Sequence, residues 1–400
     1  MKILVISQYY YPEPFRIDEI CEELVRRGHE ITVVTALPNY PDGEIYDGFP
    51  HKDNPETING VIVYRCNVRP RKTGHINLFL NYVDFWIKCM LFLRKFEGQY
   101  DCIYTYQLSP ISSSHPAISF GQKHHIPVVL YCLDLWPESM INVIPEKSKI
   151  YKLIKKYSSY IYSNSSKLAV TSRSFGYYLS SLTGVNVDEI VYIPQHSQDI
   201  GNQPAGCASF DKGDVVNFMF LGNVGESQNV HHLIRAASMI KTDVKLHVHI
   251  VGSGSYLEEV KAITNDLNMQ DLVTFYGRRP KTTMAQFYHI ADVCYLSLRD
   301  EGCVSNTIPG KLQEYMSAGK AVLACIKGDA KDVINDADCG IVVDNNDTNS
   351  LAMAMREMAN NIQKTKEYGR NARSYYLKYF TLEKHVDRLE VLLGECLSRS

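Results

Sequence analysis

The segment NTIPGKLQEYMSAGK, residues 306–320, holds residue types that could bind a phosphorylated ligand. Apolar runs flank it, so it is expected to form a short helix that begins near Pro309. The free N–H groups of a first helical turn, together with Lys311, favour an anion. Glu314 lies one turn further on the same face, where a carboxylate can accept hydrogen bonds from the two hydroxyl groups of a ribose. The spacing thus fits a nucleotide site, although by itself it favours a surface helix with a solvated Lys311–Glu314 pair.

The elements that would position this segment alternate along the chain, with short apolar runs separated by helix-length stretches. Strands that are apolar on both faces and separated by helices indicate a parallel sheet covered on both sides. The predicted fold class is therefore α/β, with doubly wound sheets. The predicted strands cover residues 2–7, 31–35, 61–66, 101–106, 126–132, 167–172, 190–194, 215–222, 245–252, 273–277, 293–298 and 321–325.

A length of 400 residues favours two domains, because single cores rarely grow past about 250–300 residues. The alternation lapses in the polar stretch QHSQDIGNQPAGCASFDKGD and then restarts. We predict a first domain over residues 1–196, a linker over 197–214 and a second domain over 215–380. A helix over about 381–400 is expected to pack back on the first domain. Both domains are expected to face a central cleft, because such sheets bind ligands at the carboxyl ends of their strands.

The overall composition points away from several classes of protein. A formal net charge of -2 gives no reason to expect nucleic acid as a partner. Eleven cysteines without a CxxC pair fit reduced cytosolic thiols better than a disulfide framework or a zinc site. Met1 is followed directly by KILVIS, which fits a buried strand rather than a signal peptide. We therefore expect a cytoplasmic protein.

Several motifs occur in the order found in a known enzyme family. The stretch EYMSAGKAVLAC follows Pro309 and Lys311, and DLWPES occupies residues 134–139. The N-terminal YYYPEPFRIDEICEELVRRGHEITVVTALPNYP, the central IPQHSQD and the later FLGNVGESQNVHHLIRAA complete the series. Over nearly its whole length the chain resembles the family 4 retaining glycosyltransferases, which have the GT-B fold. The closer resemblance is to a branch of bacterial surface-polysaccharide enzymes that act in O-antigen and capsule assembly.

This resemblance implies a metal-independent enzyme that transfers a hexosyl or N-acetylhexosaminyl residue with retention of the anomeric configuration. The donor would be a nucleotide sugar, usually linked to uridine diphosphate (UDP). No cofactor is implied, and the sequence is consistent with this, because no DxD triad follows a strand and no His/Cys cluster has ligand spacing. The acidic pair in DKGD, residues 211–214, has the wrong spacing.

The resemblance assigns the donor site to the second domain. Lys311 and the helix N-terminus would hold the diphosphate and offset the charge that builds on the leaving group. Glu314 would bind the ribose. Asn306 stands where the family has a Glu that contacts the donor sugar, and an amide can still bind a hydroxyl. Glu301, nearby in RDEGC, is a further candidate for stabilising charge at the anomeric carbon.

The phosphate site departs from the family pattern at two positions. Asn223 and Gln228 stand where many members have an Arg and a Lys that bind the diphosphate. Arg278 and Arg279, at a strand end, could supply the missing charge, although two solvated loop arginines are the alternative. The complete predicted donor-binding set is Asn223, Gln228, Arg278, Arg279, Asn306, Thr307, Lys311 and Glu314.

The first domain would supply the groups that meet the acceptor. Asp134 and Glu138 follow a predicted strand, and either could accept the acceptor's hydroxyl proton. They and Lys311 form the predicted catalytic set, with Leu133 where many members have a His. The alternative for Asp134 is a helix N-cap. Glu13 and Arg16 lie on the first strand-to-helix loop, which is expected to face the cleft.

Two segments mix bases with aromatic and aliphatic residues: residues 69–96 and residues 146–167. Such a surface suits docking onto an anionic leaflet, and the acceptor would then be a saccharide on a polyprenyl diphosphate carrier at the inner face of the cell membrane. The alternative for the first segment is a buried core helix with a basic flank. Because Asp84 and Lys88 interrupt this segment, it is not expected to span a membrane.

Other functions remain open on the sequence. A nucleotide-sugar 2-epimerase would share the fold and the donor. A sugar-binding relative without activity is a second alternative, because Asn223, Gln228, Asn306 and Leu133 depart from the family pattern. A dinucleotide oxidoreductase fits less well, since GSGS at residues 252–255 lacks the third glycine of the dinucleotide fingerprint.

Overall fold

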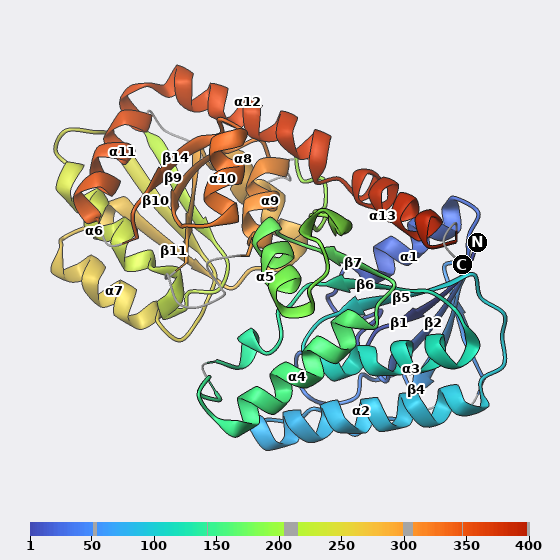
Figure 1. Cartoon of the computed structure of the whole chain (residues 1–400). Coiled ribbons are helices and arrows are strands. Elements are labelled where there is room, and N and C mark those ends of the chain that lie inside the picture. The colour runs from blue at the N-terminus through green and yellow to red at the C-terminus, as the bar shows by residue number, and fades with distance from the viewer. Residues whose placement is uncertain (51–53, 142, 204–214, 299–306, 346, 398–400) are drawn as a thin grey trace. The chain divides into compact units, whose positions relative to one another are not determined.

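The computed structural model describes residues 1–50, 54–141, 143–203, 215–298, 307–345 and 347–397, and it shows two α/β units (Figure 1). The first unit comprises Met1–Pro194 and Leu382–Ser400, and the second comprises Gln195–Thr381. Each unit is built around its own sheet and its own core. The predicted α/β class with two doubly wound sheets is confirmed.

The first unit has an eight-stranded sheet in the order β3-β4-β2-β1-β5-β6-β7-β8. All neighbours pair in parallel except β3 and β4, which are antiparallel. Its short edge strand β3 was not predicted, because its three residues lack an apolar run. The strands are β1 (Lys2–Ile6), β2 (Glu30–Ala36), β3 (Glu56–Ile58), β4 (Val61–Cys66), β5 (Cys102–Gln107), β6 (Val128–Cys132), β7 (Lys167–Val170) and β8 (Ile190–Tyr192).

Helices cover both faces of this sheet, which explains why its strands are apolar on both sides. One core contains Phe85, Ile118 and Ile161 from three helices, and the other joins Leu24 to Leu389. The helices are α1 (Ile17–Arg26), α2 (His75–Lys95), α3 (His115–His124), α4 (Lys149–Ser163), α5 (Arg173–Thr183) and the C-terminal α13 (Leu382–Leu397).

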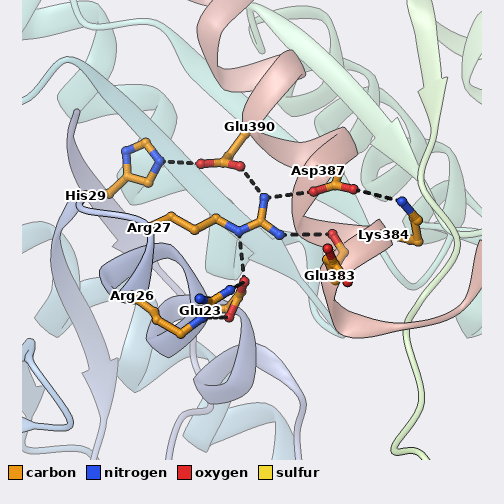
Figure 2. A network of polar contacts seen from close by, with 8 residues as sticks. All are labelled: Glu23, Arg26, Arg27, His29, Glu383, Lys384, Asp387 and Glu390. Carbon is orange, nitrogen blue, oxygen red and sulfur yellow. Dashed lines mark hydrogen bonds and ion pairs between the residues drawn. The ribbon is translucent and has the colours of Figure 1, made fainter.

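A polar network fixes α13 to α1 within the first unit (Figure 2). The Arg27 guanidinium, just after α1, donates to Asp387 at 2.9 Å and also to Glu390. It also donates to Glu23 at 2.8 Å, and His29 contacts Glu390 at 2.6 Å. Burial opposes ionisation of Glu390, but the hydrogen bonds from His29 and Arg27 outweigh it and lower the pKa of this carboxyl. The chain end is thus tied to the start of the chain.

The second unit has a six-stranded parallel sheet in the order β11-β10-β9-β12-β13-β14. Its last strand, β14, which has four half-buried residues, was not predicted. The strands are β9 (Val216–Leu221), β10 (Leu246–Val251), β11 (Val273–Gly277), β12 (Val293–Ser297), β13 (Ala321–Cys325) and β14 (Gly340–Val343). The helices are α6 (Val230–Ile240), α7 (Leu257–Asp266), α8 (Met284–Ile290), α9 (Gly310–Ser317), α10 (Asp329–Asp336), α11 (Thr348–Asn360) and α12 (Ile362–Tyr379).

The described part of the predicted linker, residues 197–203, packs on the second unit instead of standing apart from it. Asp199 accepts two hydrogen bonds from Arg373 of α12, at 2.5 and 2.8 Å. The Ser197 N–H donates to the Phe380 carbonyl at 2.9 Å. The polar composition of this stretch therefore reflects side chains that anchor it, and residues 204–214 lie outside the described residues.

Candidate functional site

In the second unit, the strand order reverses between β9 and β12, where open α/β sheets bind ligands. β9 pairs with β10 at six positions but with β12 only at Phe218–Val293 and Met219–Cys294. The two strands therefore separate toward their carboxyl ends. The loop after β9 and the start of α9 lie at this opening.

The helix that the sequence predicts to begin near Pro309 is α9 (Gly310–Ser317), and its start agrees with the prediction. Pro309 occupies the N-cap position with φ -64°, and Gly310 is the first helical residue. Leu312, Tyr315 and Met316 are buried and hold α9 against the sheet. Lys311 and Glu314 are half-buried and lie outside this buried contact.

Lys311 is not a solvated surface lysine. Its Nζ donates to Gln228 Oε1 at 2.6 Å and lies 4.4 Å from the centroid of the Phe220 ring. Burial lowers the pKa of Lys311 to about 8, although the nearby Glu314 charge acts to raise it. The ammonium is thus a poorly hydrated cation at the opening of the sheet, and a bound anion would compensate for its lost solvation.

Gly222, at the end of β9, makes this position of Lys311 possible. A Cβ atom on Gly222 would lie 2.5 Å from Cε of Lys311, and the glycine has φ +133°. Sequence reasoning missed this residue, although a glycine directly after an apolar strand was a signal for close backbone approach.

Glu314, one turn along α9, is held by a second helix. Its Oε2 accepts a hydrogen bond from the Tyr288 hydroxyl of α8 at 3.2 Å. The half-buried carboxylate therefore has a set direction, as the predicted ribose contact requires.

The other predicted donor residues lie near the same edge of the sheet. The Gly222 N–H donates to the Val251 carbonyl and the Gly252 N–H to the Gly277 carbonyl, which joins the ends of β9, β10 and β11. Asn223 is exposed on the loop after β9, Arg278 and Arg279 are exposed beyond β11, and Thr307 is half-buried before α9. Asn306 and Glu301 lie outside the described residues.

In the first unit, Asp134 is not a helix N-cap. Its Oδ2 accepts hydrogen bonds from the Ser109 N–H and hydroxyl, both at 2.8 Å. The Ser109 Oγ also accepts from Trp136 Nε1 at 3.0 Å. The loops after β5 and β6 thus orient the carboxylate. Ser109 was not predicted, since a loop serine 25 residues away carries no sequence signal.

Glu138 is bound by two tyrosines. Its Oε1 accepts from the Tyr151 hydroxyl at 2.9 Å and from the Tyr178 hydroxyl at 2.6 Å. These tyrosines belong to α4 and α5, so the carboxylate joins the short 3-10 helix Glu138–Met140 to two longer helices. This arrangement gives Glu138 a structural role in addition to the predicted one.

Glu13 was predicted on a loop that faces the ligand, but in this unit its side chain points into the protein. The residue lies between β1 and α1, as expected, but it is 2% exposed. Its Oε1 accepts from the Asn39 and Tyr40 N–H groups at 2.9 and 2.8 Å, and its Oε2 accepts from the Tyr10 N–H at 3.3 Å. Glu13 therefore fastens the loop after β1 to the loop after β2.

Arg16 stands at the N-cap position of α1. Its charge partly offsets burial, which raises the pKa of the Tyr131 phenol on β6. The guanidinium therefore lies near the carboxyl end of β6, where Asp134 follows. Among the residues that the structure describes, no group of three or more His, Cys, Asp and Glu side chains is arranged to hold a metal ion.

Two Rossmann-like α/β units with parallel sheets, matched over the whole chain by solved glycosyltransferase structures, define a protein of the GT-B class. The model for glycosyltransferase family 4 matches residues 16–195, and the model for glycosyl transferases group 1 matches residues 209–375. The chain is therefore a glycosyltransferase composed of a family 4 domain and a group 1 domain.

Three curated relatives share this class. The probable glycosyltransferase WbjE of Pseudomonas aeruginosa is 26% identical over 67% of this chain and 69% of its own length. The putative colanic acid biosynthesis glycosyl transferase WcaI of Escherichia coli K12 is 23% identical over 80% of this chain and 82% of its own. The N-acetylgalactosamine-N,N'-diacetylbacillosaminyl-diphospho-undecaprenol 4-alpha-N-acetylgalactosaminyltransferase of Campylobacter jejuni is 26% identical over 44% of this chain and 46% of its own.

Solved structures with the same fold cover the whole chain. Sucrose-phosphate synthase from Thermosynechococcus elongatus superposes with a TM-score of 0.72 at 17% identity, over 100% of this chain and 99% of that one. HepE from Anabaena, in complex with UDP, superposes with a TM-score of 0.69 at 15% identity, over 99% of this chain and 100% of that one.

Proposed function

We propose that the protein transfers a hexosyl or N-acetylhexosaminyl residue from a UDP-linked sugar to a lipid-linked saccharide, with retention of configuration and without a metal. The observation that carries this proposal is the half-buried Lys311 ammonium at the switch point of the second unit, where it donates to Gln228. The product would enter a bacterial surface polysaccharide such as O-antigen or capsule. The relative WcaI is described as acting in colanic acid biosynthesis, and HepE binds UDP.

In this proposal, the bond between the sugar's anomeric carbon and the diphosphate oxygen breaks, and negative charge builds on the diphosphate. Lys311 and the amide N–H groups at the start of α9 are positioned to stabilise that charge. Glu314 would hold the ribose, and Gln228 keeps the lysine in place before the donor binds. Asn223, Arg278, Arg279, Asn306 and Thr307 remain proposed donor contacts.

Either Asp134 or Glu138 is proposed to accept the proton of the acceptor hydroxyl. In each carboxylate, one oxygen receives two hydrogen bonds from neutral donors, which fixes the direction of the other oxygen. Asp134→Asn and Glu138→Gln separate the two roles, because only the variant that removes the base should lower kcat without raising KM.

The acceptor is proposed to be a saccharide on a polyprenyl diphosphate, which would bring the enzyme to the inner face of the cell membrane. Support comes from the Campylobacter relative, whose name includes a diphospho-undecaprenol acceptor. The mixed basic and apolar segments of the first unit, residues 69–96 and 146–167, fit a protein that works at a lipid surface.

The test compares Lys311→Ala with Lys331→Ala, an exposed lysine of α10 in the same unit. We expect Lys311→Ala to lower kcat by roughly 10²–10³, as for the loss of one donor to a developing oxyanion, while Lys331→Ala keeps wild-type kcat. Wild-type turnover in Lys311→Ala would refute the proposal. Enzyme incubated with donor alone should release no epimerised sugar, and its appearance would favour the 2-epimerase.

A further inference from the structure

Helix α2 has two apolar faces, and only one of them is covered. Phe85, Cys89 and Leu93 are buried against the sheet, with exposed fractions of 3% or less. At 100° per residue, the opposite side of the helix carries a second apolar stripe. The exposed residues of this stripe are Ile76 (76%), Phe79 (63%), Leu80 (36%), Ile87 (46%) and Leu91 (51%).

The length and composition of α2 would allow it to cross a membrane, contrary to the expectation based on Asp84 and Lys88. Its packing argues for a different position. Asn81 is fully buried, accepts from Gln8 Nε2 at 2.9 Å and donates to the Arg69 carbonyl at 2.7 Å. A spanning α2 would lose these bonds and leave the sheet uncovered. The helix therefore stays on the sheet, and its outer stripe is the face that requires a cover.

Helix α4 continues this surface and adds charge. Its exposed apolar residues are Ile150 (61%) and Leu153 (69%), one helical turn apart. Four lysines, Lys149, Lys152, Lys155 and Lys156, share the helix with them.

An aromatic chain joins α2 to α4. Trp86 of α2 stacks on His115 with 5.6 Å between ring centroids. His115 Nδ1 lies 2.7 Å from the Tyr157 hydroxyl of α4. Figure 1 shows α2 and α4 along the same border of the first unit. The two helices are therefore neighbours on one side of this unit, and both of them carry exposed apolar residues.

We propose that this side, the docking face, lies in the interface of an anionic lipid leaflet, with both helices parallel to the membrane plane. The docking face consists of the seven exposed apolar residues of α2 and α4 and the four lysines of α4. Apolar burial and attraction between lysines and anionic headgroups would act together there. A second copy of the chain is a poorer occupant, because a two-fold contact would set lysines against lysines. The inference deepens the proposed function, since it states how the enzyme meets a lipid-linked acceptor.

The test is co-sedimentation of the full chain with vesicles. Vesicles of phosphatidylcholine with phosphatidylglycerol should sediment the protein, pure phosphatidylcholine should sediment much less, and added salt should release it. The double variants Phe79→Ser/Ile87→Ser and Lys152→Glu/Lys156→Glu should each weaken binding by at least about tenfold. Met353→Ser, which removes a 67% exposed side chain of α11, is the matched control and should bind as wild type.

Equal sedimentation with both kinds of vesicle, or wild-type binding by both double variants, would overturn the docking face. A dimer that Phe79→Ser/Ile87→Ser dissociates, with vesicle binding unchanged, would assign the face to a second copy. Sugar transfer to a water-soluble acceptor separates this inference from the proposed function. The double variants should retain this activity while they lose vesicle binding. If the variants lose vesicle binding and the wild type transfers no sugar, the docking face stands and the proposed function fails.

Discussion

At the scale of single residues, the position of Lys311 depends on Gly222, which has no side chain. A methyl group on Gly222 would overlap Cε of the lysine, so Gly222→Ala should push the ammonium away from Gln228 and Phe220. We expect the Kd for UDP to rise by about tenfold, which corresponds to about 1.4 kcal/mol. Isothermal titration with UDP measures this change.

Gly319→Ala is the control for that variant. Gly319 also has a positive φ, +66°, but a Cβ there would meet its nearest neighbours only at 3.6 Å, an ordinary contact. Both substitutions should cost backbone strain of about 1–3 kcal/mol, whereas only Gly222→Ala should weaken nucleotide binding. Equal UDP affinity in the two variants would mean that Lys311 does not contact the diphosphate.

Glu13 should make stability depend on pH. Burial raises its pKa to about 7, against the N–H bonds from Asn39 and Tyr40 that lower it. Between about pH 4.5 and pH 7, the folded chain holds a proton that the unfolded chain has released. The contribution of Glu13 to the free energy of unfolding is therefore fully present below pH 4.5 and is lost as the pH rises through 7.

Glu13→Gln isolates this contribution, because Asp18, whose burial raises its pKa to about 6, acts with the same sign. The urea midpoint of the wild type should fall between pH 5 and pH 8, and that of Glu13→Gln should fall less. The difference is on the order of 3 kcal/mol at most. Parallel pH profiles would show that Glu13 ionises in the folded chain as it does in the unfolded one.

Residue types could be read from the sequence more reliably than their partners. Lys311 and Glu314 were predicted together because a helix fixes their spacing. Two of the three contacts of Glu13 come from residues 26 and 27 positions away, and the Ser109 that orients Asp134 is 25 positions away. Such contacts depend on which loops the sheet order brings together, and local periodicity does not encode that order.

At the scale of elements, α13 is held by the network around Arg27 (Figure 2). Arg27→Ala would leave Glu23, Asp387 and Glu390 without their shared cation. We expect the free energy of unfolding of the first unit to fall by about 2–3 kcal/mol. Arg26→Ala is the control, since Arg26 is 70% exposed and pairs with Glu23, and it should leave the free energy of unfolding nearly unchanged.

Limited proteolysis provides the readout for α13 itself. Cleavage within Leu382–Leu397 should become faster in Arg27→Ala and stay unchanged in Arg26→Ala. Identical cleavage rates in the two variants would show that apolar contacts, and not the Arg27 network, hold α13 in place.

Most of the apolar strands were predicted, whereas two short strands and the exposed apolar face of α2 were not. The β6 and β13 runs are apolar throughout, and β1 and β5 are mostly apolar, so their strands are plain in the sequence. β3 and β14 have three and four residues and gain their strand conformation from pairing with a neighbour. In α2, apolar residues on both sides hide which face is buried, and only the packed structure separates the covered face from the docking face.

At the scale of the whole molecule, the chain crosses between its units twice, near Pro194 and near Thr381, and each unit keeps its own sheet and cores. The sequence predicted this division because the strand–helix alternation stops and restarts. Separate cores favour separate unfolding transitions over a single two-state process.

The proposed nucleotide contacts in the described chain all belong to the second unit, so a nucleotide should stabilise that unit selectively. In calorimetry, Arg27→Ala identifies the unfolding transition of the first unit, because this substitution should lower the midpoint temperature of that transition alone. UDP at about a hundred times its Kd should stabilise the second unit by about 2.7 kcal/mol and so raise the midpoint temperature of the other transition.

Hydrogen exchange gives a second readout. With UDP bound, the amides of residues 310–312, at the start of α9, should exchange more slowly, while the exchange rates of the α13 amides should not change. If UDP instead raised the transition that Arg27→Ala lowers, the nucleotide site would belong to the first unit and the proposed role of Lys311 would be wrong.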